Sequence, residues 1–178
     1  MNIFYIDECP KQAAKWMVDK HVVKMILETA QLLSTAHRFV DGIESDGISS
    51  SGRRKKIWVL RDNRENIMYQ ATHINHPSAI WARDTLANYQ WLWQHLKALC
   101  EEYTYRYDKV HKVQSCGLMD MLYTPPYDIK KYNMTKMPSA MDEEYRISNN
   151  PIKNYRNYYK FGKASLHKWT KRQQPEWI

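Results

Sequence analysis

Four polar residues of the N-terminal region share a spacing that could support chemistry. They are separated by three, four and three residues, and their neighbours are mostly apolar: His21, Lys24, Glu28 and Gln31. On a helix this spacing places all four along one line, with the imidazole and the carboxylate two turns, or about 10 Å, apart. Such a pair can flank a substrate, with a partly buried carboxylate as acid or base. A solvated stripe between two buried faces would have the same spacing, so both interpretations stay open.

A second polar group precedes a predicted helix. His73, Asn75 and His76 stand just before Pro77 and Ser78, where a helix N-terminus favours anions such as phosphate. Structural capping of the helix is compatible with that role. Two histidines three apart could also contribute to a metal site, but no third and fourth ligand follows with familiar spacing, so we expect no metal.

Aromatic and basic residues alternate near the C-terminus. The aromatic members are Tyr155, Tyr158, Tyr159, Phe161 and Trp169, and the basic ones are Lys153, Arg156, Lys160, Lys163 and Lys168. Interleaving of this kind can stack bases while it neutralises phosphates. The alternative is that the tyrosines of a short helix lie in the core and the lysines simply face the solvent.

The charge of the chain is uneven. The net charge is +8, and residues 129–178 alone carry 11 basic and 4 acidic side chains. A basic surface of this kind suits a polyanion, because each lysine or arginine that neutralises a phosphate releases a counterion. A basic surface without a partner is the alternative. We favour DNA as the partner.

Composition excludes several classes of protein. No apolar run is long enough for a membrane span, and Met1 to Asp7 lacks the features of a signal peptide, so we expect a cytoplasmic protein with no membrane partner. Cys9, Cys100 and Cys116 form no CxxC pair, which favours reduced thiols. Gly-rich phosphate loops and other cofactor motifs are absent, so we expect no cofactor. We also expect a monomer.

The predicted fold is mainly α, a single domain over residues 1–178 with two long packed helices, a shorter C-terminal helix and irregular loops. Apolar spacing predicts one helix from Pro10 to about Phe39 and another from Ser78 to about Lys109. Asn150 and Pro151 predict the start of the C-terminal helix, which Gly162 ends.

The regions between these helices are predicted from turn-forming residues and charge. Residues 41–55 are rich in glycine, serine and charged residues and predict an exposed, mobile loop. Residues 57–60 fit a strand or a helix start equally well. Residues 114–122 predict a short helix, residues up to 150 an irregular stretch, and residues 170–178 an extended arm.

Three stretches of the sequence resemble the phage pyrimidine-dimer DNA glycosylases of the endonuclease V type. They are Asp19, Lys20 and His21 followed by Glu28, the helix after Asn75, His76 and Pro77, and the segment from Tyr158 to Ala164, which is similar to a YYGKA-like segment of the family. The order of the three stretches is kept. The chain also resembles a group of phage proteins that share DKHVVKM, ETAQLL and THxNHPS, from which no function is carried over.

This resemblance implies a mechanism. In the family, the N-terminal α-amine attacks the deoxyribose of a damaged nucleotide, a Schiff base links enzyme and DNA, and the glutamate of the first helix assists. An α-amine suits this role because its reference pKa of about 8 leaves a reactive neutral fraction near pH 7. The resemblance therefore implies Glu28 as the catalytic carboxylate, His21 as its polar orienter, and the Met1 α-amine or Lys24 as the nucleophile.

Three positions differ from the family pattern. Asn2 is bulky enough that we expect Met1 to be retained, and Leu27 and Gln31 stand where the family has arginines, so the phosphate contacts must differ. More residues than in the family separate Met1 from the first helix, so geometry decides whether the α-amine reaches Glu28.

Our hypothesis is a DNA glycosylase, with or without AP-lyase action, on a damaged or modified base in duplex DNA. The base would be flipped into a basic cleft around Glu28. The residues expected to bind DNA are Arg61, Arg64, His73, Asn75, His76, Arg156, Lys160 and Lys163. A non-catalytic nucleic-acid-binding protein on the same scaffold, and an enzyme acting on free or hypermodified nucleotides, are the alternatives.

Overall fold

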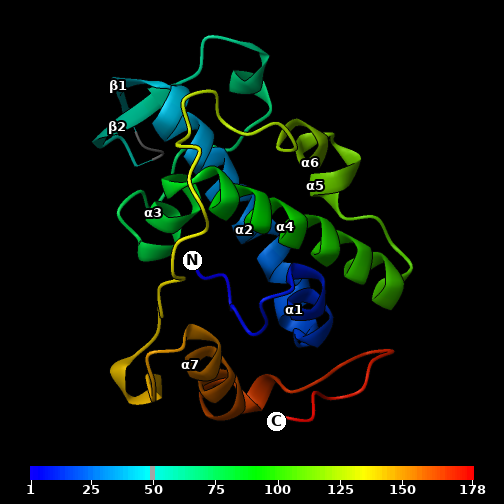
Figure 1. Cartoon of the computed structure of the whole chain (residues 1–178). Coiled ribbons are helices and arrows are strands. Elements are labelled where there is room, and N and C mark those ends of the chain that lie inside the picture. The colour runs from blue at the N-terminus through cyan, green and yellow to red at the C-terminus, as the bar shows by residue number, and fades with distance from the viewer. Residues whose placement is uncertain (49–50) are drawn as a thin grey trace.

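The computed structural model describes residues 1–48 and 51–178 and confirms the mainly helical class (Figure 1). Helices α2 (Asp19–Asp41) and α4 (Leu86–Tyr107) pack against each other as the two long helices. Helix α1 (Pro10–Trp16) packs on α4, and α3 (Pro77–Asp84) packs on both long helices. Two one-turn helices, α5 (Lys112–Ser115) and α6 (Leu118–Met121), follow α4.

The first predicted helix is interrupted, which the sequence did not indicate. Met17 and Val18 adopt extended backbone conformations between α1 and α2, and both are fully buried. The guanidinium of Arg106 explains the break, because it binds the carbonyl oxygens of Lys15 and Met17 and the carboxylate of Asp19. A long-range contact therefore ends α1 where no glycine or proline does.

The second predicted helix is also divided in two. Thr85 is extended between α3 and α4, and its hydroxyl accepts a hydrogen bond from the N–H of Asn88, as an N-cap does. The N–H of Leu86 donates to the carbonyl of Lys130 in a distant segment. The prediction of a continuous helix was therefore wrong at Thr85.

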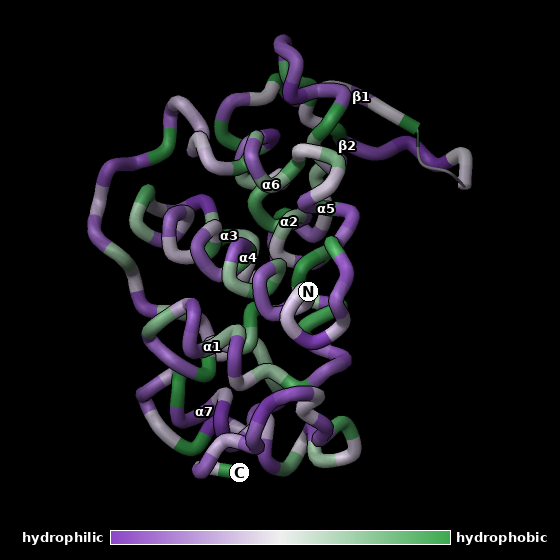
Figure 2. Tube along the Cα trace, turned by 90° about the vertical axis from the view of Figure 1, so that its right-hand side faces the viewer, coloured by the Kyte–Doolittle hydropathy of each residue, from purple (hydrophilic) through white to green (hydrophobic). Residues whose placement is uncertain are grey.

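A β-hairpin occupies most of the segment predicted as a loop. Strands β1 (Ile43–Ile48) and β2 (Arg54–Val59) pair antiparallel, from Ile43 opposite Val59 to Ile48 opposite Arg54. The predicted loop over residues 41–55 is thus wrong in its conformation, and residues 49–50 lie outside the described residues. Figure 2 shows the hairpin projecting from the helical body.

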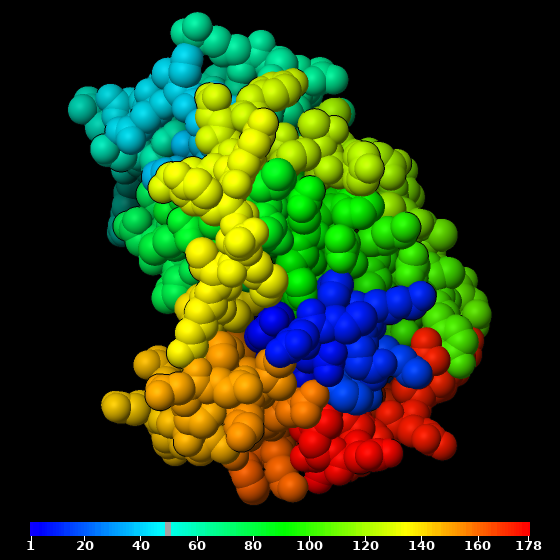
Figure 3. Space-filling model, in the orientation of Figure 1, coloured from blue at the N-terminus to red at the C-terminus, as the bar shows by residue number. Residues whose placement is uncertain are grey.

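The segment from 123 to 150 is largely irregular, as predicted, and runs across the outside of α3 and α4 (Figure 3). The indole of Trp81 and the amide of Asn88 both bind Thr135 and hold the segment in place. Short 3₁₀ turns occur at Asn63–Asn66 and Glu143–Tyr145.

The C-terminal region begins with α7 (Pro151–Asn157), which is capped by the side chain of Asn150 as predicted. A π-helical turn (Tyr158–Gly162) and a 3₁₀ turn (Ala164–Leu166) follow. Residues 170–178, predicted as an extended arm, contain turns at 170–172 and 176–177 and lie against the body, because Arg172 pairs with Glu102 of α4 and Trp177 packs on Trp16. In the described part of the chain no helix is long and apolar enough to cross a membrane.

Candidate active site at Glu28 and the chain start

Glu28 lies in the middle of α2, where it meets the start of the chain. Its Oε2 atom accepts a hydrogen bond of 3.0 Å from the backbone N–H of Asn2, and its Oε1 atom lies 3.1 Å from the Nζ atom of Lys24. The Glu28 side chain is 13% exposed, whereas that of Lys24 is 67% exposed. The carboxylate is thus largely covered, and it is bound by a main-chain group and by a solvated lysine.

The side chain of Asn2 fixes the N-terminal segment beside Glu28. Its amide nitrogen donates to the carbonyl of Ala140 at 2.7 Å, and its amide oxygen accepts from the N–H groups of Ile3 and Phe4. Phe4 has a positive φ of 53°, an uncommon backbone conformation for a residue other than glycine, and its ring stacks on His21 of α2. The extra residues before α1 therefore do not move the chain start away from Glu28.

His76 brings a third element to the same place. It caps α3, and its Nδ1 atom accepts a 3.1 Å hydrogen bond from the N–H of Ser78. Burial lowers the pKa of His76, the positive charges of the N-terminal amine and of His73 lower it further, and Glu28 opposes the shift. The imidazole is therefore within electrostatic reach of the α-amine and of Glu28, and its neutral form is favoured.

His21 lies elsewhere than we predicted. It is buried, its ring stacks on Phe4 with centroids 4.2 Å apart, and its Nδ1 atom lies 2.7 Å from the hydroxyl of Tyr159. Burial lowers its pKa to about 3, with smaller contributions from the positive charges of Lys163 and Lys24. The neutral His21 thus packs against Phe4 of the N-terminal segment, and no described hydrogen bond joins His21 to Glu28.

Two residues predicted to bind DNA are engaged in structural contacts instead. Arg64 is buried and pairs with Asp41 and Asp62 near the end of α2, about 20 Å along the helix axis from Glu28. Arg156 binds the carbonyl of Ile6 and the carboxylate of Asp7. Because carboxylates already compensate both guanidinium groups, these contacts do not favour phosphate binding by either residue.

The other predicted DNA-binding residues remain at the surface. Arg61, His73, Asn75 and Lys160 are exposed, and His76 and Lys163 are half-buried. Of these, His73, Asn75 and His76 precede α3 and lie on the Glu28 side of the molecule, since His76 senses the charge of Glu28. Lys163 is close enough to His21 to influence its charge. Their role in DNA binding stays a prediction.

The expected cleft around Glu28 stays a prediction. Glu28 lines none of five surface cavities, of about 190–740 Å³, found on residues 1–48 and 51–178. Leu27, which stands at a position where the family has an arginine, is 40% exposed beside Glu28. An incoming base would reach a carboxylate that is largely covered, next to an exposed apolar side chain.

Asn2 and Ala140 are the site residues that sequence reasoning missed. They are 138 positions apart, and neither has a residue type that signals chemistry. No group of three potential metal-ligating side chains occurs in the part of the chain that the structure describes.

Comparison with known proteins identifies the family. The sequence model of the family described as "Pyrimidine dimer DNA glycosylase" matches residues 1–115, which contain Glu28, Lys24, His21 and the chain start. No curated protein and no solved structure gave a significant match. Since the match covers more than half of the chain, the protein belongs to the pyrimidine dimer DNA glycosylase family.

Proposed function

We propose that the protein releases a damaged pyrimidine from duplex DNA by covalent catalysis, with Glu28 as the catalytic carboxylate and the amine at the chain start as the nucleophile. The main observation in support is the 3.0 Å hydrogen bond from the Asn2 nitrogen to Glu28. This hydrogen bond brings the start of the chain next to a carboxylate, a group that can accept a proton and return it during the reaction. The net charge of +8 supports a DNA substrate.

The chemistry follows from this arrangement. The amine forms a bond to C1′ of the deoxyribose while the bond from C1′ to the base breaks, and the base leaves with the electron pair and takes up a proton. The nitrogen then loses a proton, the C1′–O4′ bond breaks, and O4′ is protonated, which leaves an iminium. Glu28 is placed to take the proton from nitrogen and deliver it to O4′. Water later hydrolyses the iminium and restores the amine.

Two nitrogens lie near Glu28 as candidate nucleophiles. The Met1 α-amine is one residue from the Asn2 nitrogen, and removal of Met1 would make that nitrogen itself the α-amine, already 3.0 Å from Glu28. Lys24 is at a similar distance. An α-amine has a lower reference pKa than a lysine side chain, so a larger share of it is neutral and nucleophilic near pH 7. We therefore assign the reaction to the α-amine.

Phosphate binding is assigned to residues that surround this point. His73 and Asn75 are exposed just before α3, an eight-residue helix whose N-terminus favours anions. Lys24 and Lys163 add positive charge close to His21. The duplex would then lie over α2 and the start of α3.

The test uses a duplex with one cyclobutane thymine dimer, a matched undamaged duplex and a duplex with one abasic site. Borohydride should trap a covalent adduct on the damaged and abasic duplexes, and selective N-terminal acetylation should abolish the adduct. Glu28→Gln should lower base release by about 10²–10⁴-fold, while Glu101→Gln, at an exposed glutamate of α4, should leave it unchanged. Absence of both adduct and abasic product would overturn the proposal.

A further inference from the structure

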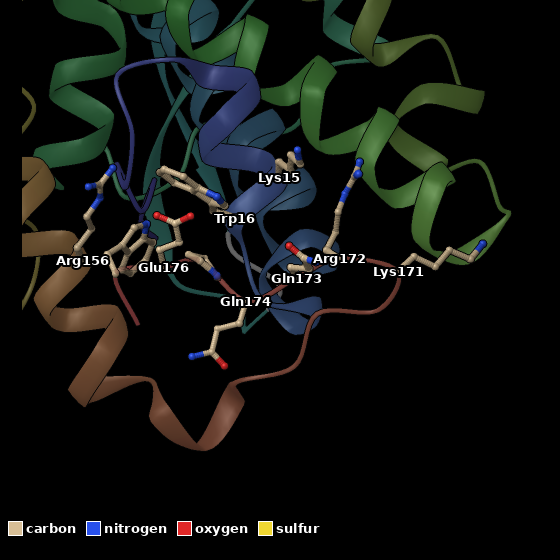
Figure 4. Close-up of a pocket in the computed structure, with 10 residues that line it drawn as sticks. Lys15, Trp16, Arg156, Lys171, Arg172, Gln173, Gln174 and Glu176 are labelled. Atoms are coloured by element: carbon tan, nitrogen blue, oxygen red, sulfur yellow. The ribbon is translucent and has the colours of Figure 1, made fainter.

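A cavity of about 740 Å³ lies between α1 and the C-terminal arm, apart from the candidate active site (Figure 4). It is lined by residues of α1, of α7 and of the arm from Lys171 to Trp177, and neither Glu28 nor the first residues of the chain contribute to it. Its volume is within the range of small-molecule sites. The function proposed above makes no use of it.

Aromatic rings form one side of this cavity. The indoles of Trp16 and Trp177 meet edge to face, with centroids 5.8 Å apart. The guanidinium of Arg156 lies over both rings, 5.0 Å and 5.3 Å from their centroids, and is fixed by the Ile6 carbonyl and Asp7. This wall is held in place before any ligand arrives, which reduces the entropic cost of binding a flat ring.

Cations form the other side. Figure 4 shows Lys15 and Arg172 across the cavity from Trp16 and Glu176. Lys15 is exposed and makes no ion pair within the described residues. Arg172 is oriented by two hydrogen bonds to Glu102, made through Nε and one terminal nitrogen, so its other terminal nitrogen keeps donors for an anion.

The balance of charge in the lining favours an anionic ligand. Four cationic side chains line the cavity, whereas Glu176 is its one carboxylate. Asp7 and Glu102, which orient Arg156 and Arg172, lie outside the lining. Arg156 belongs to the indole side, and the other three cations, Lys15, Lys171 and Arg172, lie away from it. This arrangement matches a molecule with a flat ring at one end and a phosphate at the other.

We propose that this cavity binds one nucleotide unit, with the base against the indoles of Trp16 and Trp177 and the phosphate between Lys15 and Arg172. Gln173 and Gln174 also line the cavity, and the side chain of Gln173 lies between the two sides (Figure 4), where its amide can bind the edge of the base. Inorganic phosphate alone would leave the indoles unused. The nucleotide can be free or part of a DNA strand that continues from the proposed duplex surface, and the experiment separates the two sources.

The experiment measures binding of dTMP, inorganic phosphate and a four-residue oligothymidylate by calorimetry. Wild-type protein should bind dTMP at least tenfold more tightly than phosphate. Lys15→Glu and Trp177→Ala should each weaken dTMP binding about tenfold. Lys11→Glu is the matched control, because Lys11 is exposed on the same helix, makes the same charge change and does not line the cavity. Photo-crosslinked 5-iodo-dUMP should map to the arm.

The outcomes separate this inference from the proposed function. Glu28→Gln should bind dTMP like wild-type protein, and loss of binding in that variant would place the nucleotide at Glu28 and overturn the cavity assignment. Equal weakening by Lys11→Glu and Lys15→Glu, equal affinity for phosphate and dTMP, or no binding of dTMP and oligonucleotide would also overturn it. Oligonucleotide binding much tighter than dTMP binding assigns the site to a DNA strand, and equal binding assigns it to a free nucleotide.

Discussion

The two ends of α2 and its middle each carry a carboxylate, and their surroundings differ. Asp19 at the start of the helix binds Arg106 and both the N–H and the hydroxyl of Thr170, and Asp41 at the end binds Arg64 and two backbone N–H groups. Glu28 is bound by an exposed lysine and by the second residue of the chain.

This difference separates structural carboxylates from a candidate catalytic one. Burial by itself would raise the pKa of Asp19, but hydrogen bonds from Thr170 and Arg106 outweigh it and lower the pKa. A carboxylate that accepts this many hydrogen bonds cannot take up a proton without losing some of them. The partners of Glu28 can move away or react, which a catalytic carboxylate requires.

The largest expected effect is on activity at Glu28. Glu28→Gln should lower the rate of base release from a dimer-containing duplex by about 10²–10⁴-fold, because the amide cannot accept the proton. Its free energy of unfolding in urea should change by less than about 1 kcal/mol, since the amide oxygen of Gln can still accept from the Asn2 N–H and the lost ion pair is with an exposed lysine.

Asp19→Asn is the matched comparison on the same helix. It should destabilise the protein, because Arg106 loses a buried partner, and the folded variant should keep most of its activity. If Asp19→Asn abolished catalysis in folded protein while Glu28→Gln did not, the assignment of Asp19 as structural and of Glu28 as catalytic would be wrong.

The next effect is on stability at Arg106. Arg106→Ala should lower the free energy of unfolding by about 3–5 kcal/mol, because it leaves two buried carboxylates, Asp19 and Glu102, without their shared cation. Urea denaturation followed by circular dichroism measures it. Arg54→Ala in the exposed strand β2 should change stability by less than about 0.5 kcal/mol. Equal effects of the two substitutions would show that the Arg106 network is not structural.

Arg106 also shows why the sequence predicts helices better than their ends. Apolar spacing located both long helices, because burial of one face depends on residues that are close in the chain. The break at Met17 depends on Arg106, which no local pattern reveals. At Thr85 an N-cap residue gives a local signal, but the bond from Leu86 to the distant Lys130 could not be predicted from it. The β-hairpin was not predicted as a unit. Residues 57–60 fitted a strand or a helix start, and 57–59 belong to β2, but the mostly exposed residues of β1 show no alternation of buried and exposed positions.

For the candidate site, too, the sequence indicated some residues and not others. Glu28 and Lys24 were identified from spacing, and the family match contains them. His21 shares that spacing but is buried. A separation of seven residues on a helix determines the face on which a residue lies, but not how deeply the residue is buried. The anchoring of Asn2 by Ala140 could not be predicted from residues so far apart in the chain.

A moderate effect is expected on the pH dependence of stability. The imidazole of His21 binds a proton near pH 6.5 in the unfolded chain but only near pH 3 in the folded protein. Its contribution is therefore complete above pH 6.5 and is lost progressively as the pH falls toward 3. Between pH 6.5 and 4.5, His21→Phe should reduce the slope of unfolding free energy against pH by up to about 1.4 kcal/mol per pH unit.

The slope, measured by urea unfolding at several pH values, is more informative than stability at any one pH. His37 and His95 are also buried, with pKa values lowered by burial to about 4, and they should keep their share of the slope in the variant. An unchanged slope in His21→Phe would mean that His21 is protonated in the folded protein. The stacking of Phe4 on a buried, neutral imidazole would then be wrong.

The smallest expected effect is at Lys24, which tests the nucleophile. Lys24→Gln removes an exposed ion pair, so stability should change by less than about 0.5 kcal/mol. Base release should fall a few-fold because one cation near the DNA is lost, while the borohydride-trapped adduct should persist. Loss of the adduct would instead make Lys24 the nucleophile. N-terminal acetylation completes the comparison, since only one of the two modifications can remove the reacting nitrogen, and the one that abolishes trapping identifies it.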